Sequence, residues 1–221
     1  MKKTILITGC NRGIGLELSR SLSQNNQVIA VCRKKSDELS QLDVQIEEGI
    51  DVSQLDSIQD LRSRLGDQKI DTLINNAGIG DMDTFDTLDW DKCDKLFQVN
   101  SLGPLKVTQT LLPLLNDGAK IAMITSRMGS IGDCGSGRSF GYRMSKTALN
   151  IAGVCLAHEM KEKGFPVALI HPGFVKTDMT SGKGDLEPPQ AAAQIIDRIE
   201  NDLNLETTGS FWHSNGEILP W

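Results

Sequence analysis

Tyr142 and Lys146 are the two residues whose types and spacing point most directly to chemistry. On a helix, residues i and i+4 lie one above the other, so the phenol and the ammonium would share one face. A free phenol has a pKa of about 10, and a neighbouring cation favours the phenolate, which brings proton exchange closer to neutral pH. Apolar residues recur at helical spacing after Tyr142, so we predict a helix there. The alternative is a packed tyrosine beside a solvated lysine, because this spacing is frequent by chance.

The composition of the chain indicates one α/β domain. The chain has 221 residues, of which 39% are hydrophobic and 24% charged. A net charge of −6 argues against a nucleic-acid partner. No apolar run approaches the roughly 20 residues that cross a membrane, and the start of the chain does not resemble a signal peptide. Five cysteines without a Cys/His cluster predict a cytoplasmic protein with no disulfide framework and no metal site.

A glycine-bearing turn lies between the first predicted strand and the first predicted helix. Residues 4–8 are a short β-branched run, and leucines at helical spacing follow residue 15. Glycines let the backbone approach a pyrophosphate, while the free N–H groups of the helix start point at it. The spacing Gly-x3-Gly-x-Gly differs from the common dinucleotide fingerprint, but the strand and the helix stand where that motif requires them. The predicted cofactor contacts here are Gly9, Asn11, Arg12, Gly13, Ile14 and Gly15.

Arg33 directly follows the second predicted strand, residues 28–32. In a dinucleotide fold this position meets the adenosine ribose, where an acidic residue suits NAD and an arginine suits the 2′-phosphate of NADP. No acid is present at Cys32 or Arg33, and Arg12 could bind the same phosphate from the other side. Each arginine alone could be a solvated surface charge. The two together favour NADP over NAD.

The next two predicted strands, residues 44–50 and 70–74, also end in candidate ligands, and a short helix over 34–42 precedes them. Asp51, with Val52 beside it, could bond the adenine amino group or help Ser53 to start the following helix. The strand predicted over 70–74 is followed by Asn76, Ala77 and Gly78. Small residues at the carboxyl end of a parallel strand lie where ligands bind in such sheets.

Ser126 follows the fifth predicted strand, residues 120–125, and lies at the same edge of the sheet. A glycine-rich loop joins it to Tyr142 and can bring the two side chains together. No Gly-x-Ser-x-Gly elbow surrounds Ser126, so it is not interpreted as a hydrolase nucleophile. Helices are predicted over 91–100 and 104–115. Asn100 has poor helix propensity, which by itself indicates only a local kink.

The last part of the chain adds two predicted strands, 167–170 and 210–212, and a helix over 189–203. His171 could touch substrate, but a histidine bonded to backbone at a strand end is the favoured interpretation. Residues 178–188 are polar and glycine-bearing, so they are either a lid over substrate or a mobile surface loop. Residues 214–216 predict a tight hairpin turn. Aromatic residues at 211, 212 and 221 would be buried in the domain or in a contact between subunits, which leaves a homo-oligomer open.

The sequence resembles the short-chain dehydrogenase/reductase family over most of its length. Four segments in the family's order carry this resemblance: residues 8–15 are similar to its cofactor turn, 75–78 to its sheet motif, 142–146 to its active-site motif and 172–177 to the stretch that covers the nicotinamide. Within the family, residues 209–221 resemble sniffer-type carbonyl reductases and C-factor-like proteins. The longer loop between Ser126 and Tyr142 and the short span before Gly209 depart from the common pattern, which puts the shape of the substrate pocket in doubt.

The resemblance implies a catalytic tetrad of Asn100, Ser126, Tyr142 and Lys146. It implies that Ser126 and Tyr142 bind the substrate carbonyl, that Tyr142 donates the proton, and that Lys146 holds the nicotinamide ribose and lowers the pKa of the phenol. Asn100 would support a water that links Lys146 to solvent. It also adds four residues to the cofactor contacts: Pro172, Gly173, Val175 and Thr177.

We therefore expect a single doubly wound Rossmann-type α/β domain over residues 1–221, with a central parallel sheet of about seven strands. The expected reaction is hydride transfer between NADP(H) and a small carbonyl or alcohol compound, with no nucleic-acid or membrane partner. One alternative is an NAD-linked alcohol dehydrogenase. The other is a dinucleotide-binding regulatory or signalling protein of C-factor type.

Overall fold

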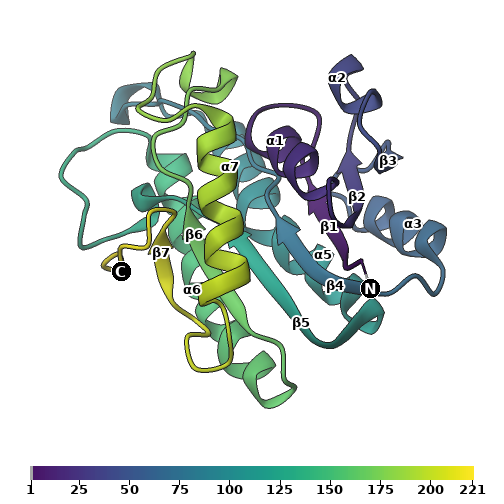
Figure 1. The fold of residues 1–221 in the computed structure, drawn as a ribbon. Helices are drawn as coiled ribbons and strands as arrows, with labels where there is room; N and C mark the ends of the chain where they lie inside the picture. The colour runs from purple at the N-terminus through teal and green to yellow at the C-terminus, as the bar shows by residue number, and fades with distance from the viewer. Residues whose placement is uncertain (1) are drawn as a thin grey trace.

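The apolar runs of the sequence form one parallel sheet at the centre of the molecule (Figure 1). The computed structural model describes residues 2–221. The strand order is β3-β2-β1-β4-β5-β6-β7, and every neighbouring pair is parallel. The strands are β1 (Thr4–Thr8), β2 (Gln27–Cys32), β3 (Gln45–Glu48), β4 (Ile70–Asn75), β5 (Leu115–Ile124), β6 (Val167–His171) and β7 (Phe211–His213).

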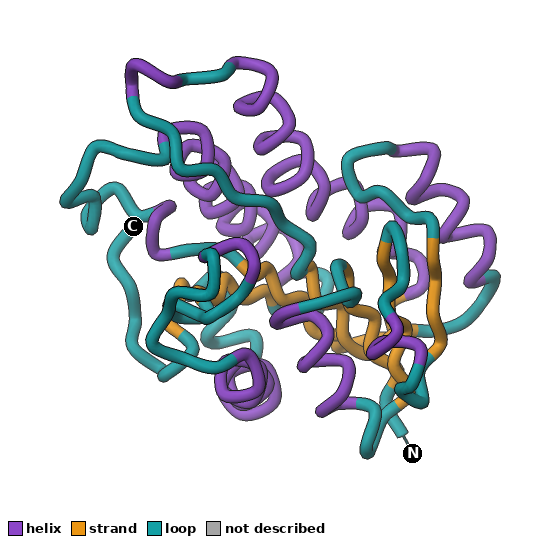
Figure 2. Tube along the Cα trace, turned by 90° about the horizontal axis from the view of Figure 1, so that it is seen from above, coloured by secondary structure: helices purple, strands orange, loops and turns teal. Residues whose placement is uncertain are grey.

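Helices cover both faces of the sheet, as Figure 2 shows. α1 and α7 pack on one face, while α3, α5 and α6 pack on the other. Parallel strands buried on both faces need apolar side chains in nearly every position, which explains why the strands appear in the sequence as uninterrupted apolar runs. The helices are α1 (Gly13–Leu22), α2 (Asp37–Ser40), α3 (Leu55–Leu65), α4 (Trp90–Phe97), α5 (Gly103–Leu111), α6 (Phe140–Glu162) and α7 (Pro188–Asp197).

Successive strand residues alternate between the two cores. Leu6 and Ile29 point to the α3–α5–α6 side, while Ile5 and Ile7 point to the α1–α7 side, and all four are buried. Burial of each such side chain contributes about 1.5–3 kcal/mol. The two cores fix the register of the sheet, because a slip by one residue would exchange the faces of every side chain.

The strand order reverses between β1 and β4, and this reversal positions the site. The chain proceeds outward from β1 to β3 on one side and from β4 to β7 on the other. At such a switch point the loops after the two central strands diverge and leave a crevice at the carboxyl ends. The predicted doubly wound fold is therefore confirmed, in a single domain.

Several predicted helix boundaries were wrong. The helix predicted over 34–42 is a single turn, α2, which begins after Ser36 because the Ser36 side chain accepts from Leu39 N at 3.2 Å and caps it. The helix predicted from Ser53 begins at Leu55. The helix predicted over 104–115 ends at Leu111, and a 3-10 turn leads into β5, which begins five residues earlier than predicted because Leu115 pairs with Ile70. The helix predicted over 189–203 ends in a π-helical turn, η6 (Arg198–Asp202).

Asn100 lies in a π-helical turn, η2 (Gln98–Leu102), which joins α4 to α5 without a break. Such single-turn insertions are rare and occur often at functional sites. The predicted kink is thus a widened turn, and it turns the Asn100 side chain into the interior, where the residue is fully buried.

The end of the chain folds back on β7. His213 N donates to Glu217 O at 2.8 Å, and Leu219 N donates to Phe211 O at 2.8 Å, so the predicted turn at 214–216 is confirmed. Phe211 and Trp212 are buried within the domain, whereas Trp221 is 49% exposed and stacks on Phe211.

Candidate active site

A groove of about 390 Å³ runs along the carboxyl ends of the central strands. It brings together residues from the glycine turn, the ends of β2 and β4, the start of α6 and the segment after β6. Two predicted contacts, Gly173 and Val175, are buried and lie outside its lining. The predicted cofactor residues that line it are Gly9, Asn11, Arg12, Gly13, Ile14, Gly15, Arg33, Asp51, Val52, Asn76, Ala77, Gly78, Tyr142, Lys146, Pro172 and Thr177.

The glycine turn has the shape that a pyrophosphate needs. Gly9 and Gly13 have positive φ angles of 75° and 56°, which glycine adopts without strain. No side chain caps α1 at Arg12, so the N–H groups of its first turn point toward the groove without a side-chain acceptor among the described residues. An uncapped helix N-terminus beside a tight glycine turn binds an anion well. The turn therefore fits the diphosphate of a dinucleotide.

Gly15 packs directly against Gly9 and Asn76 in the turn, and we expect Gly15→Ala to disrupt this packing. A Cβ there would overlap the carbonyl oxygen of Gly9 and lie 2.5 Å from Asn76 Nδ2. Overpacking of this kind costs about 1–3 kcal/mol of unfolding free energy. We expect a lower melting temperature and weaker NADPH binding. Gly137→Ala is the matched control, since its Cβ would meet no atom within 4 Å. Equal cofactor affinity in both variants would contradict this role.

Asn76 fastens the end of β4 to the glycine turn. Its Nδ2 donates to Thr8 O at 2.9 Å and to Gly9 O at 3.2 Å. The backbone N–H groups of Asn76 and Ala77 both donate to Thr8 Oγ1 at 3.0 Å. The two bonds from Nδ2 occupy both N–H groups of the Asn76 side chain. The residue therefore shapes the groove by holding the backbone of the glycine turn.

The end of the groove beside β2 carries two arginines and two acids, Arg12, Arg33, Asp51 and Asp178. Arg33 is exposed at the end of β2, and Arg12 lies in the glycine turn. Asp51 Oδ1 accepts from both the N–H and the hydroxyl of Ser53, which is a local turn and not the helix cap that the sequence suggested. Burial would raise the pKa of Asp51, but the bonds from Ser53 and the charges of Arg33 and Lys95 lower it below its ordinary value. Asp51 is therefore ionised at neutral pH.

Tyr142 and Lys146 lie on the first turns of α6 and both line the groove. The start of α6 is held by Asp83, whose carboxylate accepts from Phe140 N at 2.5 Å and from Gly141 N at 3.3 Å. Nothing in the sequence singled out Asp83, because it is distant from α6 along the chain and belongs to no motif. It satisfies the free N–H groups of the helix start and thereby fixes the direction of the Tyr142 turn.

Lys146 is an ammonium in a nearly closed environment. Its side chain is 4% exposed, and Nζ donates to Ile124 O at 2.9 Å. Burial lowers the pKa of Lys146 to about 8, because the charged form loses its hydration. Gly78 gives the amine its room: a Cβ on Gly78 would lie 3.7 Å from Nζ and 3.3 Å from Asn100 Oδ1.

The pKa of Tyr142 differs in direction from the sequence-based expectation. Burial raises it, and a hydrogen bond with the side chain of Ser126 opposes that rise. Lys146 is not among the groups that shift the pKa of Tyr142, and its Nζ donates to Ile124 O at 2.9 Å. In the protein alone, Tyr142 is therefore a protonated phenol at neutral pH, which is the form that can donate a proton.

Ser126 and Asn100 are buried beside this pair and are not among the residues that line the groove. The hydroxyl of Ser126 accepts from Met128 N at 3.1 Å, and this side chain opposes the rise that burial causes in the pKa of Tyr142. Asn100 Oδ1 accepts from Ile79 N at 2.9 Å, and its Nδ2 donates to Ile79 O and to Ser145 Oγ. The structure thus brings the four expected residues into one cluster, with Asn100 tying the loop after β4 to α6.

Several residues that line the groove were not predicted from the sequence. Ile79 and Val99 belong to no motif, and only their positions after β4 and in the widened turn place them there. Asp178 and Met179 lie in the segment that was expected to be a lid or a loop. His171 was expected to bond backbone, but it packs edge-on against His213, and its Nδ1 is buried without a partner among the described residues.

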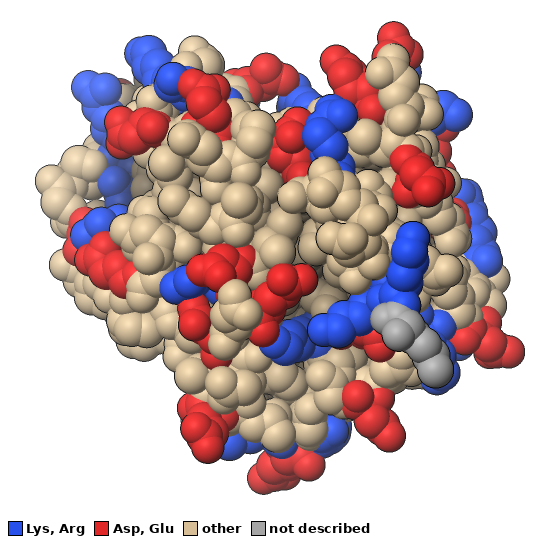
Figure 3. All heavy atoms as spheres, viewed as in Figure 1, with Lys and Arg blue, Asp and Glu red and all other residues tan. Residues whose placement is uncertain are grey.

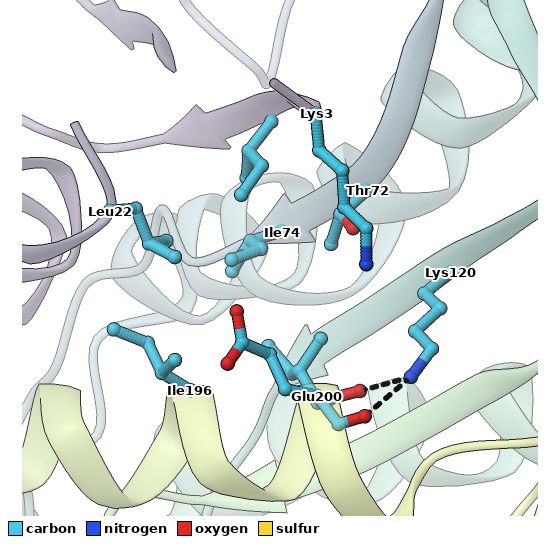
Figure 4. Close-up of a pocket in the computed structure, with 9 residues that line it drawn as sticks. Lys3, Leu22, Thr72, Ile74, Lys120, Ile196 and Glu200 are labelled. Carbon is cyan, nitrogen blue, oxygen red and sulfur yellow. Dashed lines mark hydrogen bonds between the residues drawn. The ribbon is translucent and has the colours of Figure 1, made fainter. Parts of the chain in front are cut away.

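A second pocket lies between the sheet and η6, away from the groove (Figure 4). Lys120 Nζ points into it and donates to Ile199 O at 2.6 Å and to Glu200 O at 3.1 Å. The pocket measures about 20 Å³, which is room for about one water molecule. Lys120 thus caps a helix end. Acidic and basic side chains are interspersed over the face of the molecule shown in Figure 3.

Known proteins resemble this chain over its whole length. A 1-hydroxy-2-glutathionyl-2-methyl-3-butene dehydrogenase from Rhodococcus sp. (strain AD45) is 39% identical over 225 residues, which is 99% of either chain. The solved carbonyl reductase Sniffer of D. melanogaster has a TM-score of 0.91 and 29% identity, with 100% of both chains covered. The NADPH-bound carbonyl reductase from chicken fatty liver has a TM-score of 0.90 and 29% identity, covering 100% of this chain and 99% of its own.

The family assignment rests on a further match. The model of the family described as "short chain dehydrogenase" matches residues 3–187, from β1 to the start of α7. None of the described helices is long and apolar enough to cross a membrane. The matched span contains the glycine turn, the end of β4 and the Tyr142–Lys146 turn described above. This chain belongs to the short-chain dehydrogenase/reductase family.

Proposed function

We propose that this protein transfers hydride between NADP(H) and a small carbonyl or alcohol compound at the Tyr142–Lys146 end of the groove. It is an NADP-dependent oxidoreductase of its family, similar to the carbonyl reductases. The single observation that carries the proposal is the position of Tyr142 and Lys146 at one end of a groove whose glycine turn fits a diphosphate. When bound, the nicotinamide supplies or accepts the hydride.

The residues around Tyr142 provide the proton and the charge that the reaction needs. Ser126 and Tyr142 bind the carbonyl oxygen, and Tyr142 gives its phenolic proton to that oxygen as the carbon is reduced. Lys146 lines the same end of the groove, where its ammonium is proposed to hold the nicotinamide ribose. Asn100 holds the loop after β4 against α6, which supports the position of Lys146. In the reverse direction, Tyr142 takes the proton from an alcohol.

Arg12 and Arg33 form the proposed site for the 2′-phosphate of NADP(H). Both line the groove at its adenosine end, and neither β2 nor the residue after it supplies an acid for the 2′-hydroxyl of NAD. The solved carbonyl reductase from chicken fatty liver is NADPH-bound, which supports this choice. The remaining proposed contacts are Gly9, Asn11, Gly13, Ile14, Gly15, Asp51, Val52, Asn76, Ala77, Gly78, Tyr142, Lys146, Pro172, Gly173, Val175 and Thr177.

We expect Arg33→Ala to weaken NADPH far more than NADH. Charge-assisted hydrogen bonds to phosphate contribute about 1.5–3 kcal/mol, so NADPH affinity should fall roughly 10- to 100-fold. NADH has no 2′-phosphate and should bind nearly as before. Fluorescence titration with each cofactor measures both changes. Equal losses for the two cofactors would remove Arg33 from the 2′-phosphate site.

Turnover on a panel of aldehydes, ketones and quinones tests the proposed reaction. We expect NADPH to be consumed with at least one class of carbonyl compound, and at a higher kcat/KM than NADH. The Rhodococcus relative is named for a dehydrogenase reaction, so the panel should include alcohols with NADP⁺. Tight NADPH binding without turnover on any compound would contradict the proposal and favour a dinucleotide-binding regulatory protein.

A further inference from the structure

The segment from Val175 to Leu186, here called the strap, is a closed loop that precedes α7 (Figure 1). Its two ends are joined, since Val175 and Leu186 form a β-bridge and Lys176 N donates to Leu186 O at 2.9 Å. Lys176 also pairs with Glu187 at 2.5 Å. The strap therefore has a fixed base, and its tip is a single 3-10 turn, Asp178–Thr180.

The tip of the strap spans the mouth of the groove. On one side, a Cβ on Gly13 would lie 3.4 Å from Thr177 Cγ2. On the other side, a Cβ on Gly80 would lie 2.9 Å from Met179 Cγ. The strap thus contacts the glycine turn with one residue and the loop after β4 with another. Asp178 lies between these two contacts and lines the groove.

One ion pair ties the tip to the glycine turn. Arg12 Nη1 donates to Asp178 Oδ2 at 2.6 Å, and the two side chains are 67% and 71% exposed. An exposed pair of this kind contributes about 0–1 kcal/mol and exchanges readily with other partners. Arg12 is also one of the two arginines at the adenosine end, so its guanidinium has two candidate acceptors, one in the protein and one on the cofactor.

The other acid in the groove lining is already bound elsewhere. Asp51 accepts from Ser53, and the charges nearest to it are those of Arg33 and Lys95. Asp178 is therefore the carboxylate that holds Arg12 among the described residues. A 2′-phosphate carries about two negative charges and binds arginine through two parallel bonds, which makes it the stronger acceptor.

We propose that Asp178 tunes the choice of cofactor, because its carboxylate competes with the 2′-phosphate of NADP(H) for Arg12. This inference rests on the proposed assignment of Arg12 to the 2′-phosphate. NADP(H) displaces Asp178 when it binds, which releases the tip of the strap from the glycine turn. NAD(H) has only a hydroxyl at that position and leaves the ion pair intact.

Removal of the competing charge should strengthen NADPH binding alone. In Asp178→Asn, Arg12 is free before the cofactor arrives. The expected gain is about two- to fivefold in NADPH affinity, which is the range that an exposed ion pair of this strength allows. NADH affinity should stay within about 1.5-fold of wild type by the same reasoning. The ratio of the two affinities therefore rises.

Fluorescence titration with NADPH and with NADH tests this in five proteins: wild type, Asp178→Asn, Arg12→Ala, the double variant, and Asp185→Asn. Asp185 is an exposed acid of the same strap outside the groove lining, so it controls for the loss of one negative charge. We expect the gain in Asp178→Asn, no gain in Asp185→Asn, and no further gain when Asp178→Asn is added to Arg12→Ala.

Two results would overturn the competition while leaving the proposed function intact. The first is unchanged or weaker NADPH binding in Asp178→Asn, and the second is a gain that persists without Arg12. If Arg12→Ala binds NADPH and NADH as wild type does, the assignment of Arg12 to the 2′-phosphate fails, and the inference fails with it. Melting temperatures of all five proteins identify any loss of cofactor affinity that arises from misfolding.

Discussion

Tyr142→Phe should lose roughly 100- to 10,000-fold in kcat, because it removes the one phenolic proton that the proposed reaction uses. Tyr142 is the only tyrosine in the chain, so no neighbouring phenol can replace it. The ring remains, and with it the packing at the start of α6. Steady-state turnover with NADPH and the best carbonyl compound measures the loss.

The same variant should retain its cofactor affinity. The arginines and the glycine turn that are proposed to hold the adenosine and the diphosphate are unchanged in this variant, so NADPH should bind within about threefold of wild type. A titration alongside the turnover assay separates binding from chemistry. Turnover within threefold of wild type would refute the proton-donor role.

Lys146→Met should make the protein more stable at pH 7 while it removes most turnover. The pKa of Lys146 is lowered from 10.5 to about 8, so the folded state holds this charge at a cost of about 3 kcal/mol at neutral pH. Methionine has a similar length and no charge. The variant leaves Ile124 O without the hydrogen bond from Lys146, and this loss lowers the unfolding free energy by about 1 kcal/mol. The net expectation is a gain of about 2 kcal/mol in unfolding free energy.

The stability gain should depend on pH. Below pH 8 both folded and unfolded wild type carry the Lys146 proton, and the full cost applies. Between about 8 and 10.5 the unfolded chain binds more protons than the folded one, so wild-type stability rises with pH and the advantage of the variant shrinks. Chemical unfolding at pH 7 and pH 10 measures this. Lys161→Met, at an exposed lysine of the same helix, should change stability by less than about 0.5 kcal/mol at either pH. A destabilised Lys146→Met would contradict the account.

The sequence predicted the sheet and most of the groove because both depend on local signals. A short apolar run followed by a glycine turn and a leucine-spaced helix leaves few alternatives to β1, Gly9–Gly15 and α1. Arg33 was found by its position after β2. Such signals lie within about ten residues of one another, so no tertiary information is needed to read them.

What the sequence could not predict depends on contacts across the fold. Asp83 caps α6 from 57 residues away, and Asp178 reaches Arg12 across 166 residues. The π-helical turn at Asn100 has no signal beyond a poor helix former. The pKa of Tyr142 was expected to fall through Lys146, but burial raises it, and neither the burial of the phenol nor the direction of the Lys146 side chain can be derived from an i, i+4 spacing.

Transfer of deuterium from the C4 position of labelled NADPH to a carbonyl substrate tests the central claim most directly. The account predicts that the product alcohol gains one deuterium at the former carbonyl carbon with wild type, and that Tyr142→Phe gives almost none in the same time. Tight binding of labelled NADPH with no deuterium in any product of the carbonyl panel would contradict the account, because the groove would then bind the cofactor without performing hydride transfer.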